Sequence, residues 1–244
     1  MRAVFWKELR SFLSSLIAYL VISVFLVMTG LFMWVFKDTS LLEYNYAGLE
    51  QLFSLGPLVF TFLIPAITMR SFSEEHSQGT IELLATKPLT DTQIILGKYF
   101  ANVALVFLAI LPTLIYFYSV YQLGSPKGNI DTGAVVGSYI GLMFLAAIFV
   151  AIGIWASSVS SNQIVSFILA AFLCFAMHWA FSYLCNLSIF FGTWDDVVQK
   201  IGINHHYNAI SKGKIDSQNV IYFISVICAF IWFTHVSLAK RKWA

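Results

Sequence analysis

The sequence predicts an all-α integral membrane protein, and three observations support this fold class. Hydrophobic residues make up 59% of the 244 residues and charged residues only 11%, whereas a soluble globular domain carries roughly 25% charged residues. The apolar residues stand in long blocks, without the alternation or amphipathic spacing of soluble strands and helices. Six blocks approach the ~20 residues that a helix needs to cross a bilayer. We expect one membrane domain over residues 1–244.

Residue by residue, the predicted spans are approximately 12–36, 52–69, 99–123, 134–155, 164–184 and 220–238. The first follows several basic residues, as in a signal peptide, but it has roughly 25 residues and no A-x-A cleavage site, so we expect it to stay in the membrane. In the second, Gly56-Pro57 and Pro65 predict a kinked or partly re-entrant helix. In the third, Pro112 is tolerated where neighbouring helices satisfy the freed carbonyl.

The distribution of Lys and Arg predicts the orientation of the chain. With the N-terminus inside, nine basic residues face the cytoplasm and five face outward; the cytoplasmic ones are Arg2, Lys7, Arg10, Arg70, Lys87, Lys98, Lys240, Arg241 and Lys242. Most of the acidic residues outside the connection at residues 70–98 fall on the external side. We therefore predict that both termini lie in the cytoplasm.

The connection at residues 70–98, between the second and third spans, predicts ordered short helices. Ser71 and Glu74 fit a capping box that would start a helix with Glu74 and Glu75 in its first turn, and Gly79 would end this helix. At the end of the connection, Thr90 and Gln93 form another capping-box pattern, which would open the third span.

A second short helix is predicted within this connection, over residues 81–86. Thr80 can cap it, Leu83 and Leu84 give it an apolar edge, and Pro88 follows its end. Docking to another protein suits such helices, and the alternative is that they lie on the lipid head groups. The acidic residues of the connection (Glu74, Glu75 and Glu82) weigh against the second interpretation, because anionic lipids favour basic faces.

Two further segments predict interfacial amphipathic helices. Residues 5–12 mix charged and apolar side chains, with Trp6 at head-group depth; a simple positively charged anchor is the alternative. In the external segment 186–218, Thr193 can cap a helix over residues 194–201 that Gly202 closes. This helix would lie on the outer leaflet, or the segment would fold as a loop over the helix ends.

Small and ionisable residues inside the spans give two further predictions. Gly133, Gly137 and Gly141 repeat at G-x-x-x-G spacing, which permits close helix packing; we expect packing within the chain, with a dimer seam as the alternative. His178 lies within the fifth span, where an ionisable group is costly and often functional. An interhelical hydrogen bond is the role expected for it.

Several classes of function do not fit the sequence. The net charge of +2 is too small to suggest a nucleic-acid partner. The spans hold too few ionisable groups for an ion-coupled carrier or a charged pore. His205-His206 has no carboxylate or cysteine at ligand spacing, and the serines at residues 157–161 have no catalytic partner, so we expect no metal site and no catalytic residues. The chain also lacks a G-x-x-x-x-G-K-[ST] loop, so energy must come from a partner.

The run R-S-F-S-E-E-x-x-x-G-T-I-E-L-L-x-x-x-P-L-T-D-x-x-I-I-x-G-K-Y, which starts at Arg70, resembles the signature of ABC-2 type transporter permeases. The stretch from Asn208 to Asp216 and the final helix with its basic end are similar to the C-terminal end of this family, although Asn219 stands where an acidic residue is expected. The resemblance is nearest to the gliding-motility-associated permease subunit (GldF type) of gliding bacteria.

The resemblance implies a non-catalytic subunit of the bacterial inner membrane. A separate cytoplasmic P-loop ATPase would bind ATP and Mg, so that this chain needs no cofactor, and a second membrane subunit, identical or different, would complete the transporter. The residues that would receive the motion of the ATPase are Glu74, Glu75, Gly79, Thr80, Glu82, Leu83, Leu84 and Pro88. A scaffold that anchors an ATPase or a motility or secretion complex without transporting anything is the alternative.

Overall fold

The computed structural model describes the chain except for residues 45–46, 81–88, 186–194, 215 and 241–244, and the described residues form helices without strands. Six helical stretches are long and apolar enough to cross a membrane. Their bounds are Leu16–Trp34, Glu50–Ser77, Asp91–Leu123, Thr132–Val159, Gln163–Cys185 and Ser217–Ala239. The predicted fold class, an all-α membrane protein with six spans, is confirmed.

The first apolar block begins later than the sequence predicted. An N-terminal helix, α1 (Arg2–Leu13), is separate from the first span, α2 (Leu16–Trp34). The side chain of Ser15 accepts a hydrogen bond from the amide of Ile17 at 3.2 Å and so caps α2. The span therefore begins at Leu16, close to the approximate start predicted at residue 12, because Ser15 caps a new helix inside the hydrophobic block.

The second span is α4 (Glu50–Thr68), which contains both Pro57 and Pro65 in one unbroken helix, so the re-entrant alternative is wrong. Pro57 has no N–H to donate to the carbonyl of Phe53 one turn earlier. The hydroxyl of Tyr207 donates to this carbonyl instead, at 2.6 Å. Burial raises the pKa of the Tyr207 phenol well above its ordinary value, so the hydroxyl keeps its proton.

The third span begins as the capping-box pattern predicted, with Thr90 and Gln93 closing both hydrogen bonds at the start of α7 (Asp91–Ile110). Pro112 lies in a short 3₁₀ turn, η1 (Leu111–Thr113), and α8 (Leu114–Leu123) continues the span. The 3₁₀ turn accommodates the proline because its ring excludes a regular α-helical bond at that point.

The fourth span, α9 (Thr132–Val159), forms the centre of the molecule. It packs against α4, α7, α10 and α14, and Leu142, Leu145 and Phe149 on it are fully buried. Gly153 lets α4 cross closely, because a Cβ there would overlap the side chain of Thr68. Any displacement of α9 therefore affects most of the other spans.

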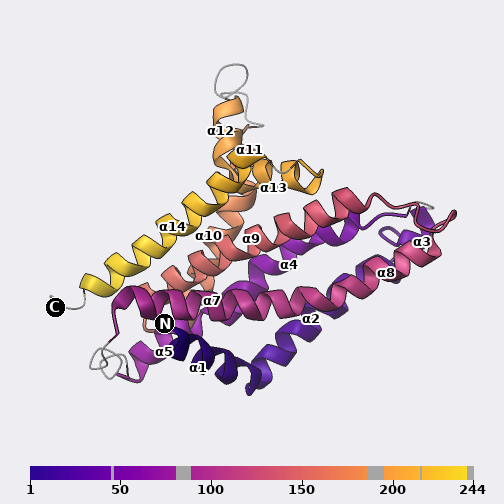
Figure 1. The fold of residues 1–244 in the computed structure, drawn as a ribbon. Helices are drawn as coiled ribbons and strands as arrows, with labels where there is room; N and C mark the ends of the chain where they lie inside the picture. The colour runs from indigo at the N-terminus through magenta and orange to yellow at the C-terminus, as the bar shows by residue number, and fades with distance from the viewer. Residues whose placement is uncertain (45–46, 81–88, 186–194, 215, 241–244) are drawn as a thin grey trace.

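The last part of the chain lies on one side of this bundle (Figure 1). The fifth span consists of α10 (Gln163–Phe175), a π-helical stretch η2 (Ala176–Ala180) and α11 (Phe181–Cys185). The helix predicted over residues 194–201 is present from its second residue as α12 (Asp195–Ile201), and its predicted Thr193 cap lies outside the described residues. The next helix, α13 (Ile203–Ser211), was not predicted. The final span is α14 (Ser217–Lys240).

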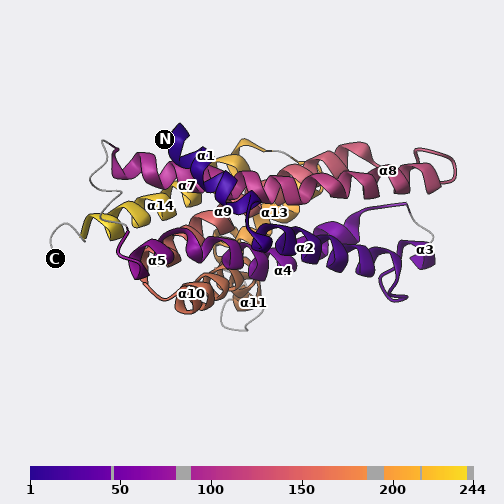
Figure 2. The same ribbon diagram turned by 90° about the horizontal axis from the view of Figure 1, so that it is seen from below.

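The two ends of the bundle differ (Figures 1 and 2). One end holds α1, α5 (Arg70–Ser77) and the start of α7. The short helix α3 (Leu41–Tyr44) and the end of α8 lie at the other. We call these the α5 end and the α3 end.

Candidate functional site

The residues that the resemblance singled out lie on α5 and just beyond it. Glu74 and Glu75 are in the middle of α5, and Gly79 follows its end with a φ of +66°. This left-handed conformation favours glycine and ends the helix, as predicted. The hydroxyl of Thr80 reaches back to the carbonyl of Glu75 at 3.5 Å. The other predicted residues, Glu82, Leu83, Leu84 and Pro88, lie outside the described residues, as does the predicted helix over residues 81–86.

The predicted capping box at the start of α5 is wrong. Only one residue, Met69, separates the end of α4 from the start of α5, and no side chain caps α5. Ser71, Phe72 and Ser73 are buried against the bundle, while Glu74 and Glu75 are only partly buried. The sequence pattern therefore predicts which side of α5 is buried, but the helix already begins at Arg70, before the predicted cap Ser71.

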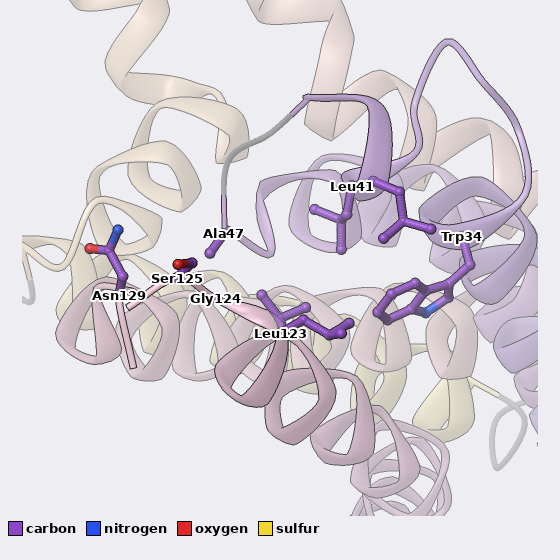
Figure 3. Close-up of a pocket in the computed structure, with 9 residues that line it drawn as sticks. Trp34, Leu41, Ala47, Leu123, Gly124, Ser125 and Asn129 are labelled. Atoms are coloured by element: carbon purple, nitrogen blue, oxygen red, sulfur yellow. The ribbon is translucent and has the colours of Figure 1, made fainter. Parts of the chain in front are cut away.

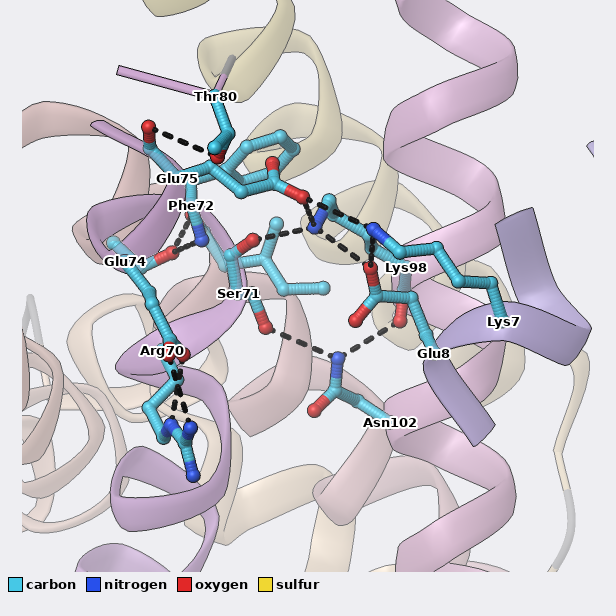
Figure 4. A network of polar contacts seen from close by, with 12 residues as sticks. Lys7, Glu8, Arg70, Ser71, Phe72, Glu74, Glu75, Thr80, Lys98 and Asn102 are labelled. Atoms are coloured by element: carbon cyan, nitrogen blue, oxygen red, sulfur yellow. Dashed lines mark hydrogen bonds and ion pairs between the residues drawn. The ribbon is translucent and has the colours of Figure 1, made fainter. Parts of the chain in front are cut away.

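Lys98 on α7 is the centre of a polar cluster at the α5 end (Figure 4). Only 1% of this residue is exposed. Its ammonium donates to Glu75 Oε1 at 2.8 Å, to Glu8 Oε1 at 3.0 Å and to the carbonyl of Ser71 at 2.6 Å. A lysine ammonium has three N–H donors, and all three have acceptors.

The Lys98 cluster, defined as Lys7, Glu8, Ser71, Glu75, Lys98 and Asn102, is balanced in charge. Lys7 lies 3.6 Å from Glu8 Oε1 and 3.7 Å from Glu75 Oε1, so two lysines face two glutamates. Burying an unpaired charge costs several kcal/mol or more, and this pairing offsets the cost. The cluster joins α1, α5 and α7.

Two close approaches hold the cluster together. A Cβ at Gly97 would lie 2.9 Å from Val4 Cβ, so glycine at this position lets α1 lie directly on α7. The amide of Asn102 donates to Ser71 Oγ at 3.2 Å, which ties α7 to α5 a turn further into the bundle. The ring of Phe72 lies 5.0 Å from the Lys98 ammonium, within reach of a cation–π contact.

α5 is also tied to the central span. The amide of Phe72 donates to Ser157 Oγ on α9 at 3.1 Å, and both residues are buried. The neighbouring Ser158 accepts a hydrogen bond at its carbonyl from Ser237 of α14, at 3.2 Å. A movement of α5 would therefore reach α9 and α14 through hydrogen bonds.

Arg70 and Glu74 form a separate ion pair along the outer side of α5. The Nε–Oε2 distance is 2.9 Å, and about a third of each side chain is exposed. Because both groups reach solvent, this pair contributes little to stability.

Sequence reasoning missed Glu8, Lys98, Asn102 and Ser157 as site residues. Lys98 was counted only as a basic residue on the cytoplasmic side and as part of the run that resembles the family signature. A signal was present: once Thr90 is recognised as the cap, Lys98 falls well inside the helix, on the face of Ile94 and Ile95, which are buried. A charged residue on a buried helix face requires partners.

The three predicted packing glycines differ in their surroundings. A Cβ at Gly137 would lie 2.8 Å from the carbonyl oxygen of Ile210, and one at Gly141 would lie 3.2 Å from Ile210 Cγ2. Both glycines therefore face α13 of the same chain. A Cβ at Gly133 would lie 3.4 Å from Asp131 Oδ1, which belongs to the cap of the same helix.

The histidines also differ from expectation. His178 is 3% exposed, and its Nδ1 has no hydrogen-bond partner among the described residues. Ring contacts with Phe149, Trp179 and Tyr207 surround it, and Nδ1 does not make the expected interhelical hydrogen bond within the described part of the chain. His206 bonds to Asn219 Oδ1 at 2.7 Å and stacks on Tyr222, which gives Asn219 a role within the chain.

Two separate cavities lie away from the Lys98 cluster. One of about 300 Å³ opens near the α3 end, between Trp34 and Leu41 on one side and Leu123 and Asn129 on the other (Figure 3). The second, of about 450 Å³, lies between α4, α9, η2 and α13 and is lined in part by His178.

The six apolar helices define a multi-pass membrane protein. Residues 2–189 match the sequence model of the ABC-2 family transporter protein, and the chain belongs to this family. Members are typically non-catalytic membrane permease subunits, which in general work with an ATPase partner as membrane-embedded dimers. A comparison with individually curated proteins gave no match.

Proposed function

We propose that this chain is a permease subunit that receives the motion of a separate ATPase at its α5 end and passes it to the central span. The observation that carries the proposal is the Lys98 cluster, in which one fully paired ammonium joins α1, α5 and α7. The family membership supports the transport function. ATP and Mg would bind to the partner.

The contacts of α5 support a mechanical role for this end. α5 packs on α9, and the Phe72–Ser157 hydrogen bond joins the two helices inside the bundle. Because α1 and α7 hold α5 through buried charges, the three elements would move as one unit. A partner that binds α5 differently in its nucleotide-bound and nucleotide-free states would thereby shift the conformation of the membrane helices.

The proposed orientation places the α5 end and both termini in the cytoplasm, within a bacterial inner membrane. The excess of basic residues on this side supports it. The test is thiol labelling in sealed vesicles, in a chain whose three cysteines have been replaced by serine. Ser77→Cys at the α5 end should react only after the cytoplasmic side is exposed, and Ser125→Cys at the α3 end only from the opposite side. The reverse pattern would overturn the proposed coupling.

The transporter is distinguished from a non-transporting scaffold by ATP turnover. The chain is purified with the ATPase that associates with it in its own cells, and ATP hydrolysis is measured for Glu82→Lys and Leu84→Asp variants of the connection. A large loss of turnover supports coupling, whereas unchanged turnover favours the scaffold. The exposed Lys127→Ala, in the connection between α8 and α9, is the control and should leave turnover unchanged.

The biological setting that we infer is surface movement of gliding bacteria. The resemblance of the connection at residues 70–98 and of the C-terminal stretch to the GldF-type permease subunit supports it. The second membrane subunit would be another copy of this chain or a related one. Deletion of the gene in a gliding bacterium should abolish surface spreading, and normal spreading of the deletion strain would overturn this setting.

A further inference from the structure

The second span contains a turn that is weak for two reasons. Pro57 removes the helical donor for the carbonyl of Phe53, and the hydroxyl of Thr61, one turn later, donates to the carbonyl of Pro57 at 2.8 Å. Sharp kinks in helices occur mostly at proline, and threonines that bond back in this way often bend their helix. Gly56, directly before the proline, adds backbone freedom. α4 therefore carries a place at which it can bend.

A side chain from another helix closes this turn. The hydroxyl of Tyr207, on α13, donates to the carbonyl of Phe53 at 2.6 Å, and the two residues are 154 positions apart in the sequence. Only 3% of Tyr207 is exposed, so water does not compete for the bond. Because Pro57 has no N–H to offer, the hydroxyl supplies the donor that the hydrogen-bond ladder of α4 lacks at this point.

Two other elements fix the position of the Tyr207 ring. Gly141 on α9 leaves room for it, since a Cβ at that glycine would lie 3.6 Å from Tyr207 Cδ2. On another side, the π-helical stretch η2 carries His178, whose ring centroid lies 6.0 Å from that of Tyr207. The hydroxyl of Ser138 on α9 also donates to the carbonyl of Ser211, at the end of α13, at 2.9 Å. The seat of α13 on α9 therefore decides whether the hydroxyl reaches α4.

We propose that Tyr207 is a latch between α13 and α4. While its hydroxyl bonds to the carbonyl of Phe53, the turn at Pro57 stays closed, and when α13 shifts and the bond opens, α4 is free to bend there. Only Met69 separates α4 from α5, so a bend at Pro57 changes the angle between the start of α4 and the α5 end. α13 thereby controls the shape of the span that continues into α5.

The latch rests on the proposed function only for the force that shifts α13, and the bond and the bend need no ATPase. The test therefore uses the full chain alone, in phosphatidylcholine nanodiscs, and measures hydrogen–deuterium exchange of backbone amides. Tyr207→Phe keeps the ring and removes only the hydroxyl. Exchange reports local opening of a helix, so we expect it to rise roughly fivefold in peptides that cover residues 54–61, as for the loss of about one hydrogen bond.

Two further variants separate the latch from general packing. Pro57→Ala restores an N–H that can donate to the carbonyl of Phe53, so in this background Tyr207→Phe should no longer raise exchange in α4. Tyr99→Phe is the matched control, because Tyr99 is also buried and its hydroxyl donates to the carbonyl of Ala147 on α9 at 3.3 Å. No proline lies four residues after Ala147, so that carbonyl keeps its helical donor. Exchange in α4 should stay unchanged in this control.

A distance measurement tests the bend itself. Glu50 and Ser77 are the two ends of the helical stretch formed by α4 and α5, and both are exposed. Spin labels on Glu50→Cys and Ser77→Cys, in a chain whose own cysteines are replaced by serine, report the distance between these ends by pulsed electron paramagnetic resonance. Tyr207→Phe should add a population with a shorter distance, and Pro57→Ala should remove that population.

Three outcomes would overturn the proposal. They are exchange or end-to-end distances that Tyr207→Phe leaves unchanged, a rise in exchange that persists in the Pro57→Ala background, and an equal rise in the Tyr99→Phe control. None of these results depends on whether an ATPase binds at the α5 end. Failure of the latch and failure of the coupling function are therefore distinguishable.

Discussion

The Lys98 cluster and the cavity of about 450 Å³ beside His178 are both polar regions in an apolar bundle, but they differ in the charge that they bury. At the α5 end, full charges are buried, and all three donors of Lys98 have acceptors within 3.0 Å. In the cavity the groups are uncharged apart from two exposed residues, and His178 Nδ1 has no partner among the described residues. Glu75 Oε2 and Asn102 Oδ1 of the cluster also lack partners among the described residues, so the two regions differ in the charge that they bury and not in whether every polar atom is paired.

This difference fits the coupling role proposed for the α5 end. A site that transmits movement has to keep its geometry under load, so paired buried charges between three elements suit it. Both regions touch the central span, the first at Ser157 and the second at Ser138.

The largest effect is expected at the centre of the cluster. Lys98→Met would leave the partly buried carboxylates of Glu8 and Glu75, whose side chains are 13% and 12% exposed, without their main partner, and removing one member of a buried ion pair costs up to about 3–5 kcal/mol. The free energy of unfolding can be measured by titration with sodium dodecyl sulfate in mixed micelles. Exposed Lys127 supplies the control, and Lys127→Met should change this free energy by less than about 0.5 kcal/mol.

A further variant separates charge from packing at Lys98. If the cost arises from uncompensated carboxylates, the triple variant Lys98→Met, Glu8→Gln, Glu75→Gln should recover a large part of the lost stability, because a neutral replacement removes the unpaired charges. If instead Lys98→Met destabilises no more than Lys127→Met, the ammonium does not hold the three helices together. The contrast with the cavity would then disappear.

A smaller effect is expected where the wall of the cavity is packed. Gly137→Ala would place a Cβ 2.8 Å from the carbonyl oxygen of Ile210 and 3.0 Å from Gly213 Cα. Both are backbone atoms, which cannot rotate away, so we expect a loss of about 1–3 kcal/mol from overpacking. The same titration measures it.

The neighbouring glycine of the same repeat provides the matched control. Gly133→Ala meets only Asp131 Oδ1, at 3.4 Å, and an alanine in a helix interior is favoured over glycine by up to ~1 kcal/mol. Gly133→Ala should therefore be neutral or stabilising. Equal losses at the two positions would mean that α13 does not rest on Gly137.

The fold could be predicted from the sequence where a local rule decides the structure. Bilayer thickness sets the length of an apolar block, so the spans emerged with the correct number, and the Thr90 cap was visible because its partner Gln93 is three residues away. The first span begins later than predicted because Ser15 caps a helix inside the hydrophobic block. α13 was missed because its apolar side is fixed by packing on α9.

The candidate site was predicted only in part, because its centre depends on contacts between distant residues. Glu75 was identified through the resemblance, but its partner Lys98 is 23 residues further along, and Glu8 lies 90 residues before that lysine. No periodicity links these positions, and the signature run that contains both Glu75 and Lys98 does not show that the two side chains pair. The Ser71 capping box failed for a similar reason: α4 runs almost directly into α5, so no cap is needed there.

The smallest effect is expected at the ion pair that resembles the cluster most closely. Arg70 and Glu74 are 2.9 Å apart, like the pairs of Lys98, but about a third of each side chain is exposed. Solvent screens such a pair, and exposed pairs four residues apart on a helix contribute only about 0.3–0.5 kcal/mol. A double-mutant cycle with Arg70→Ala and Glu74→Ala measures this coupling energy, which should fall further at high salt. A coupling energy close to that of Lys98 with Glu75 would show that burial does not separate the two pairs, because both join a cation to a carboxylate at a similar distance.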